Sequence, residues 1–173
     1  VTLLSKRVKA HVLGTPASAD RLVYEEADDS FYMGVQRTRD DRFICITLQS
    51  TVSTEQRCTS AATPGEFQVI APRERDHEYQ ADHLGGRWVI RTNWQAKNFR
   101  LVALKDGQPL GDKRLWTDVV PAKADVFIED YDLFDGFIAI AERSGGLKRL
   151  RTLDATGKST FVASDEPAYA MSF

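Results

Sequence analysis

Three short segments of this chain share one pattern, and that pattern limits the fold more than any other feature. Each segment begins with a pair of turn-forming residues and continues with an aromatic and then a β-branched residue. They are residues 40–48 (DDRFICITL), 85–93 (GGRWVIRTN) and 135–143 (DGFIAIAER). The aromatic residues recur about every 45 to 50 residues, a period typical of the four-stranded blades of a β-propeller. Because these strands lack a polar face, we expect blades that pack on a neighbour at each side.

Turn residues divide the rest of the chain into strands that group in fours. The predicted strands are 6–13 and 21–25; 31–38, 42–48, 56–60 and 67–70; 77–84, 88–92, 99–104 and 115–120; 126–131, 137–142, 147–153 and 159–163; and 169–173. From this grouping we assign residues 1–30 to the outer half of a blade and residues 31–74, 75–124 and 125–166 to three complete blades. Residues 167–173 are assigned to the start of another blade. No window has helical periodicity with a cap at each end. The prediction is all-β, a single partial propeller domain.

Composition excludes several classes of protein. Lys and Arg number 23 against 25 Asp and Glu, for a net charge of −2, so nucleic-acid and anionic-membrane partners are disfavoured. A hydrophobic content of 42% is enough for a buried core. The chain contains neither an apolar run long enough to cross a bilayer nor a signal-like start. Because it opens on Val1 in mid-pattern, we expect a segment of a longer protein, with a cytoplasmic location as the default.

Two cysteines, Cys45 and Cys58, are present. Two thiols in a domain of this size, without secretory features, are more typical of free buried cysteines than of a disulfide framework. They also lack the paired spacing of a zinc site. We therefore expect free thiols.

The run HVLGTPASADRLVYEEAD, residues 11–28, resembles the propeller of prolyl-oligopeptidase-type serine peptidases, and oligopeptidase B (protease II) most closely. The similarity continues in order along nearly the whole chain. Supporting stretches are 31–38, 54–57, 92–93, 96–101, 142–143, 146–147 and 165–169. No single motif among them is diagnostic, so the ordered set carries the resemblance.

That resemblance implies a fold and an activity. The fold is a seven-bladed propeller, of which this chain holds three to four blades, covering an α/β-hydrolase domain with a Ser-Asp-His triad. The activity is cleavage of short peptides, in the oligopeptidase B branch after Lys or Arg. On this reading the segment is a non-catalytic gate that filters substrates by size. Its partners are the hydrolase domain of the same parent chain and short peptides, and no cofactor is implied.

The sequence contains no complete catalytic or metal site. A nucleophile elbow needs G-x-S-x-G, which is absent, and Ser144 reads as part of a hairpin turn. His11 is expected to be a hydrogen-bonded structural residue. His77 and His83 lie on one face of a strand, but about 20 Å apart at strand rise, too far to share a metal ion. We expect neither catalytic nor metal-binding residues here.

Four charged residues are candidates for contacts with the hydrolase domain or with the tunnel: Glu25, Glu26, Asp28 and Arg143. The acidic cluster is either a solvated loop between blades, an interdomain contact, or a field that attracts basic peptides. Arg143 is either an interblade or interdomain ion-pair partner or a solvated residue at the end of a strand.

Two other functional classes stay open. A stand-alone propeller scaffold would bind partners through its rim. A carbohydrate-active propeller would need paired carboxylates, for which Glu129, Asp130 and Asp132 are candidates. Three tryptophans bear on the second class: Trp88 is expected in the core, whereas Trp94 and Trp116 are undecided between packing and sugar stacking.

A partial ring leaves the first and the last sheet each with an uncovered apolar face. Exposed apolar surface of this kind favours association. We therefore expect the isolated segment to self-associate.

Overall fold

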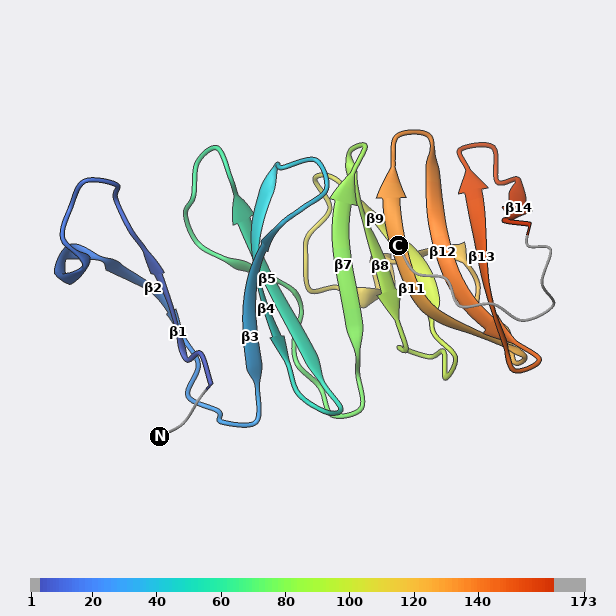
Figure 1. The fold of residues 1–173 in the computed structure, drawn as a ribbon, viewed down its shortest axis with the longest axis horizontal. Coiled ribbons are helices and arrows are strands. Elements are labelled where there is room, and N and C mark those ends of the chain that lie inside the picture. The colour runs from blue at the N-terminus through green and yellow to red at the C-terminus, as the bar shows by residue number, and fades with distance from the viewer. Residues whose placement is uncertain (1–3, 164–173) are drawn as a thin grey trace.

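The computed structural model describes residues 4–163, which form four antiparallel sheets arranged in a row in chain order (Figure 1). A two-stranded sheet pairs β1 (Arg7–Ala10) with β2 (Arg21–Glu25). Blade 1 consists of β3 (Tyr32–Arg37), β4 (Phe43–Gln49), β5 (Thr54–Ser60) and β6 (Gln68–Ala71). Blade 2 consists of β7 (Tyr79–Leu84), β8 (Arg87–Thr92), β9 (Arg100–Lys105) and β10 (Thr117–Val120). Blade 3 consists of β11 (Val126–Phe134), β12 (Phe137–Ser144), β13 (Leu147–Asp154) and β14 (Ser159–Phe161).

Within each blade, every strand pairs with the next one along the chain, so each blade is a simple meander. Tight turns make this possible. β7 and β8, for example, are joined by Gly85 and Gly86, whose φ angles are 65° and 76°. A two-residue hairpin turn with both φ angles positive favours glycine. The predicted all-β class, with four-stranded antiparallel sheets like propeller blades, is confirmed.

Strands β4 and β8 have apolar side chains on both faces because each contributes to two cores. In β4, Cys45 packs into the cluster between blades 1 and 2, whereas Ile46 and Leu48 pack toward the two-stranded sheet. In β8, Trp88 lies in the cluster shared with blade 1 and Val89 in the cluster shared with blade 3. Alternate side chains of one strand thus fill the cores on its two sides.

Several predicted boundaries shift in the structure. β1 ends at Ala10 rather than at residue 13, and a short 3-10 helix, η1 (Ala17–Ala19), occupies the loop before β2. A second one, η2 (Lys113–Leu115), delays the start of β10 to Thr117. Asp112 caps η2, with its side chain accepting the Arg114 N–H. The strand expected at 169–173 lies outside the described residues.

Within residues 4–163, no helix is long and apolar enough to cross a membrane. Large apolar side chains are exposed at both ends of the row: Val12, Leu13 and Leu22 at the two-stranded sheet, and Phe137, Phe161 and Val162 on blade 3. Self-association of the isolated segment stays a prediction.

Candidate functional site

The most unusual polar cluster of the described structure lies at the junction between blades 1 and 2. His83, near the end of β7, has no exposed surface. Its Nδ1 lies 2.6 Å from Asp40 Oδ2, and its Nε2 lies 2.7 Å from Asp106 Oδ1. Asp40 belongs to the turn after β3 of blade 1, and Asp106 to the turn after β9 of blade 2. One buried imidazole therefore contacts a carboxylate at each of its nitrogens.

The turn after β3 holds the Asp40 side chain in place by hydrogen bonds. Asp40 Oδ1 accepts the Thr38 hydroxyl at 3.0 Å and the Arg42 N–H at 3.2 Å, which leaves Oδ2 free to contact His83. Arg42 in turn donates from Nη1 to Asp106 Oδ2 at 2.8 Å. The cluster therefore joins blade 1 to blade 2 by two routes, through His83 and through Arg42.

The electrostatics of this junction favour ionised carboxylates. Burial alone would raise the pKa of Asp40 and of Asp106. For Asp40, hydrogen bonds from His83, the Arg42 N–H and the Thr38 hydroxyl outweigh burial and lower the pKa. For Asp106, hydrogen bonds from His83 and the Arg42 guanidinium do the same. Both side chains are therefore carboxylates at neutral pH.

Asp82 extends the network toward blade 3. Its Oδ1 accepts the Arg39 N–H at 2.8 Å and the His83 N–H at 2.7 Å. Burial, with Asp132 and Asp40 nearby, raises the pKa of Asp82. The Arg39 guanidinium lies 4.7 Å from the centre of the Phe134 ring and 3.7 Å from Asp132 Oδ2. The turn of blade 1 thus contacts both following blades.

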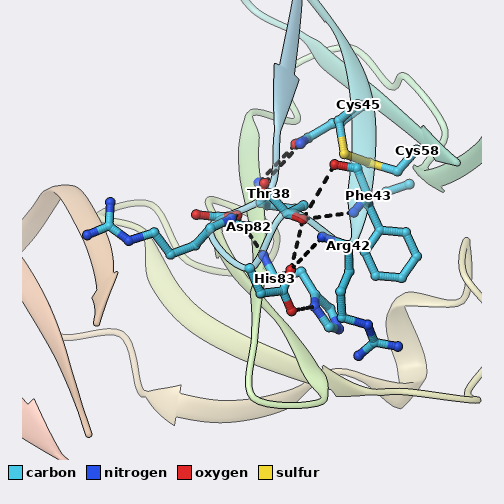
Figure 2. The surroundings of a disulfide bond; sticks show 12 residues. Thr38, Arg42, Phe43, Cys45, Cys58, Asp82 and His83 are labelled. Atoms are coloured by element: carbon cyan, nitrogen blue, oxygen red, sulfur yellow. Dashed lines mark hydrogen bonds and ion pairs between the residues drawn. A yellow bond between two sulfur atoms is a disulfide. The ribbon is translucent and has the colours of Figure 1, made fainter. Parts of the chain in front are cut away.

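A disulfide borders this cluster (Figure 2). Cys45 and Cys58 face each other directly on β4 and β5, with their Cα atoms 4.1 Å apart, and they are bonded. The expectation of free thiols is therefore wrong. Spacing along the sequence does not reveal strand register, and register is what brings these two residues together. Beside the bond, the rings of Phe43, His83 and Trp88 contact one another, with centroids 4.8 to 5.0 Å apart.

A groove of about 670 Å³ opens next to the disulfide and separates the outer parts of the two blades. Cys58 and Trp88 line it, as do the basic side chains of Arg42 and Lys105 and the acidic ones of Glu66 and Asp106. The mixture of charges gives the groove no preference for an anion or a cation.

Comparison with known proteins assigns the fold to a family. The sequence profile described as "Prolyl oligopeptidase, N-terminal beta-propeller domain" matches residues 2–173. The chain belongs to this family. The family expected from the ordered resemblance is therefore confirmed.

Individual relatives refine this assignment. The chain is 61% identical over 171 residues to the dipeptidyl aminopeptidase BI of Pseudoxanthomonas mexicana, an alignment that covers 98% of the chain and 23% of the relative. Protease 2 of Moraxella lacunata is 26% identical over 162 residues, with 93% of the chain and 23% of the relative covered. The structure of oligopeptidase B from Leishmania major superposes with a TM-score of 0.86 at 27% identity, covering 96% of this chain and 24% of that one. The chain thus spans about a quarter of the length of these relatives. It is much more similar to the dipeptidyl aminopeptidase than to the oligopeptidase B branch expected from the sequence alone.

Of the four residues expected to contact a second domain, all within the described part of the chain, only Glu26 and Asp28 are in contact, through the Asp28 N–H and Glu26 Oε1 at 2.9 Å. Glu25 pairs with Arg7 at 2.8 Å, and Asp28 accepts hydrogen bonds from Ser30 in its own loop. Arg143 donates to Glu129 Oε1 at 2.7 Å within blade 3. The contact of these residues with a hydrolase domain stays a prediction.

Glu26, the fourth of these residues, is buried in a second charged cluster. It accepts Arg73 Nη2 at 2.7 Å and the Tyr24 hydroxyl at 2.8 Å, and Arg73 also contacts Glu55, which Arg57 binds as well. Burial acts to raise the pKa of Glu26, but the Arg73, Asp28 and Tyr24 donors together lower it to about 2. The cluster links β2 to blade 1.

The histidines occupy separate environments. His11 Nδ1 lies 2.7 Å from Asp20, as a structural residue would. His77 Nε2 lies 3.0 Å from Thr92 Oγ1, and burial, together with Lys113, lowers the pKa of His77 to about 4. His83 has the two aspartates described above. Within residues 4–163, no group of three or more His, Cys, Asp or Glu side chains is placed to hold a metal ion.

The carboxylates considered for sugar chemistry are engaged locally. Glu129 is held by Arg143 and by Lys148 at 3.3 Å, and these cations lower its pKa despite its partial burial. Asp130 and Asp132 each accept the N–H of the following residue. A general acid needs a raised pKa, so Glu129 is unsuited to that role. Trp88 lies in the core as expected, and Trp94 and Trp116 pack edge to face, 5.9 Å apart.

The sequence alone did not identify the residues of the blade junction. Asp40 and Asp106 are turn residues, and aspartate in a turn normally serves the turn itself. The sequence did contain one sign that His83 is buried: it lies in a strand whose alternate positions are otherwise buried and apolar. The positions of its two partners along the chain could not be read from that signal.

Proposed function

We propose that this chain is a non-catalytic segment of the propeller of a longer serine peptidase, where it limits which peptides reach the hydrolase domain. One observation carries the proposal. The row of face-packed four-stranded blades is matched over residues 2–173 by the N-terminal propeller of the prolyl oligopeptidase family.

The physical basis is steric. A closed ring of such blades leaves a narrow axial channel, which an extended peptide can enter and a folded protein cannot. Packing of the propeller against the catalytic domain would also exclude water from the reaction. The segment itself lacks the G-x-S-x-G sequence of a nucleophile elbow, so its contribution is access and not bond cleavage.

For the substrate, we propose peptides with a free amino terminus, from which the parent enzyme releases dipeptides. The support is the 61% identity to a dipeptidyl aminopeptidase over 98% of the chain. The second candidate is cleavage of short peptides after Lys or Arg, as originally expected. It is supported by the likeness to Leishmania major oligopeptidase B, at 27% identity.

Two substrates separate these candidates. The full-length protein that contains this segment is assayed with a dipeptidyl amide whose amino terminus is free, and with the same amide after N-acylation. Dipeptide release requires the free amine, so we expect turnover of the first substrate alone. Equal turnover of an N-acylated arginyl amide would instead support the second candidate.

Size filtering is tested with a matched pair of substrates. One is a short cleavable peptide, and the other carries the same peptide fused to a small folded protein. We expect the full-length enzyme to cleave only the free peptide, and the isolated segment to cleave neither. Equal cleavage of both by the full-length enzyme would contradict the gating role.

We also propose that the protein works in an oxidising compartment, rather than in the cytoplasm expected from its sequence. The Cys45–Cys58 disulfide supports this, because disulfides persist in such compartments and are rare in the cytosol. In the source cells, rapid acid quenching followed by thiol alkylation should leave both cysteines unlabelled unless a reductant is added. Labelling without reductant would contradict the proposal.

A further inference from the structure

The environment of His83 determines its protonation state. A neutral imidazole has one N–H and one lone pair, and an ionised carboxylate only accepts hydrogen bonds. With Asp40 at 2.6 Å from Nδ1 and Asp106 at 2.7 Å from Nε2, both ring nitrogens must donate. The geometry therefore fits an imidazolium that is shared by two blades.

The charged groups around the ring come from three elements. Asp40 and Arg42 belong to the turn after β3, Asp106 to the turn after β9, and Asp82 to β7 itself. Asp82 is engaged through one oxygen by the N–H groups of Arg39 and His83 and does not bond the ring. The cluster of Asp40, Arg42, His83 and Asp106 is neutral while His83 carries its extra proton, and it has a charge of −1 without that proton.

We propose that His83 is a proton-dependent latch between blades 1 and 2, closed while its imidazole is protonated and weakened when the proton leaves. A neutral ring keeps one N–H, so one of the two carboxylates then faces a lone pair at hydrogen-bond distance. Asp106 belongs to the same blade as His83, whereas Asp40 belongs to blade 1. The contact that can separate is therefore the one to Asp40, and its loss loosens the junction.

The direction of the pH dependence follows from the partners. The latch requires ionised carboxylates, and the pKa values of Asp40 and Asp106 are both lowered, so its acid limit lies below the ordinary aspartate range. On the alkaline side it weakens as the ring loses its proton. The aromatic rings of Phe43 and Trp88 enclose the site and strengthen the electrostatic contacts by keeping water away. This latch goes beyond the proposed gating function and is independent of the substrate.

Hydrogen–deuterium exchange of the full-length protein tests the latch. Exchange of peptides that cover residues 38–45 and 79–86 is followed from about pH 6 to about pH 9, a range in which histidine titrates, and is corrected for intrinsic exchange. In the wild type, loss of one charge-assisted hydrogen bond should lower protection about tenfold across this range. The His83→Gln variant should show no such decrease, since it has no proton to lose.

The Asp106→Asn variant provides the sharpest comparison. Its amide N–H can donate to the lone pair of a neutral ring, while the other ring nitrogen donates to Asp40. Protection in this variant should therefore persist at alkaline pH. His77→Gln is the matched control: His77 is also buried in blade 2, but with a pKa of about 4 it is neutral throughout the range, so the wild-type pH dependence should remain.

The test does not depend on a single variant. If His83→Gln fails to fold, comparing the pH dependence of protection in Asp106→Asn and in the wild type still tests the latch. Wild-type protection that does not change with pH would overturn the proposal. The same pH dependence in wild type and Asp106→Asn would also overturn it.

Discussion

The two junctions between blades are held by different chemistry. Between blades 1 and 2, charged and polar contacts add to an apolar cluster: His83 with its two aspartates, Arg42 with Asp106, and the Gln56 side chain with the backbone of Ala81 at 2.9 and 3.0 Å. Between blades 2 and 3, the buried cluster is almost wholly apolar. Its polar contacts include the Tyr131 hydroxyl, which donates to the Val89 carbonyl oxygen at 2.6 Å, and Arg91 Nε, which donates to the Ile128 carbonyl oxygen at 2.8 Å.

This difference has a physical consequence. Apolar burial depends little on pH, and truncation costs free energy in proportion to the volume removed. A buried charged cluster is stable only while every member has its partner, because an unpaired buried charge is costly. The first junction can therefore respond to solution conditions, whereas the second provides constant cohesion.

The largest effect is expected for His83→Ala, which leaves the Asp40 Oδ2 atom without its ring partner, whereas Asp106 keeps only its pair with Arg42. Removing one partner from a buried charged group costs about 3–5 kcal/mol. Denaturant unfolding of the propeller in the full-length protein measures this cost. A loss below about 1 kcal/mol would mean that solvent reaches the cluster and that the two junctions differ less than their contacts indicate.

At the second junction, Leu133→Ala should destabilise the propeller by about 3 kcal/mol, the usual cost of a cavity in a packed core. Leu133 is 2% exposed and lies between blades 2 and 3. Unlike the effect of His83→Ala, this loss should be the same at mildly acidic and mildly alkaline pH. Leu147→Ala, at a site 38% exposed, is the control and should cost far less. A Leu133→Ala cost that varies with pH would contradict the contrast drawn between the junctions.

The sequence allowed much of the fold to be predicted, because period and turn chemistry are local properties. Segments such as 85–93 contain their own hairpin signal, and a strand that is apolar at successive positions indicates burial on both faces. The structure agrees, with Val89 and Ile90 of β8 packed into opposite cores. β10 begins late because the 3-10 helix η2 includes its first expected residue, and β1 ends early because the chain enters a turn, closed by the Thr15 N–H on the Val12 carbonyl oxygen.

The candidate site could not be predicted in the same way, because its parts meet only through register and blade packing. Cys45 and Cys58 are opposite each other only once β4 and β5 are aligned. Asp40 and His83 are brought together by the stacking of two blades, which no local pattern encodes. Glu26 looked like part of a solvated acidic loop, yet Arg73, from the segment that connects blades 1 and 2, buries it in an ion-pair cluster.

A smaller effect is expected for Tyr131→Phe, which removes the hydroxyl bonded to the carbonyl oxygens of Val89 and Gln80 at 2.6 and 3.2 Å. Leaving buried acceptors unpaired should cost about 1–2 kcal/mol of propeller stability. Burial raises the pKa of Tyr131 well above its ordinary value, so the hydroxyl stays protonated and the cost should not change from neutral to mildly alkaline pH. Tyr32→Phe, at a site 70% exposed, should have no measurable effect. A pH-dependent cost for Tyr131→Phe would mean that the carboxylates near this hydroxyl, Asp82 and Asp130, change the strength of the second junction as they titrate.

The smallest effect is expected for Arg143→Ala, away from both junctions. Its guanidinium pairs with Glu129 on the adjacent strand, and half of its side chain is exposed, so the pair should contribute less than about 1 kcal/mol. A double-mutant cycle with Glu129→Gln measures this coupling directly. Because the pair lies within one blade, we also expect kcat/KM of the full-length enzyme to be unchanged.

Arg149→Ala, a substitution at an exposed position on β13, is the control. A fall in kcat/KM confined to Arg143→Ala, with stability unchanged, would show that this arginine contacts something outside the segment. In that case its pair with Glu129 would orient it for that contact, and cohesion between blades would still rest on the two junctions.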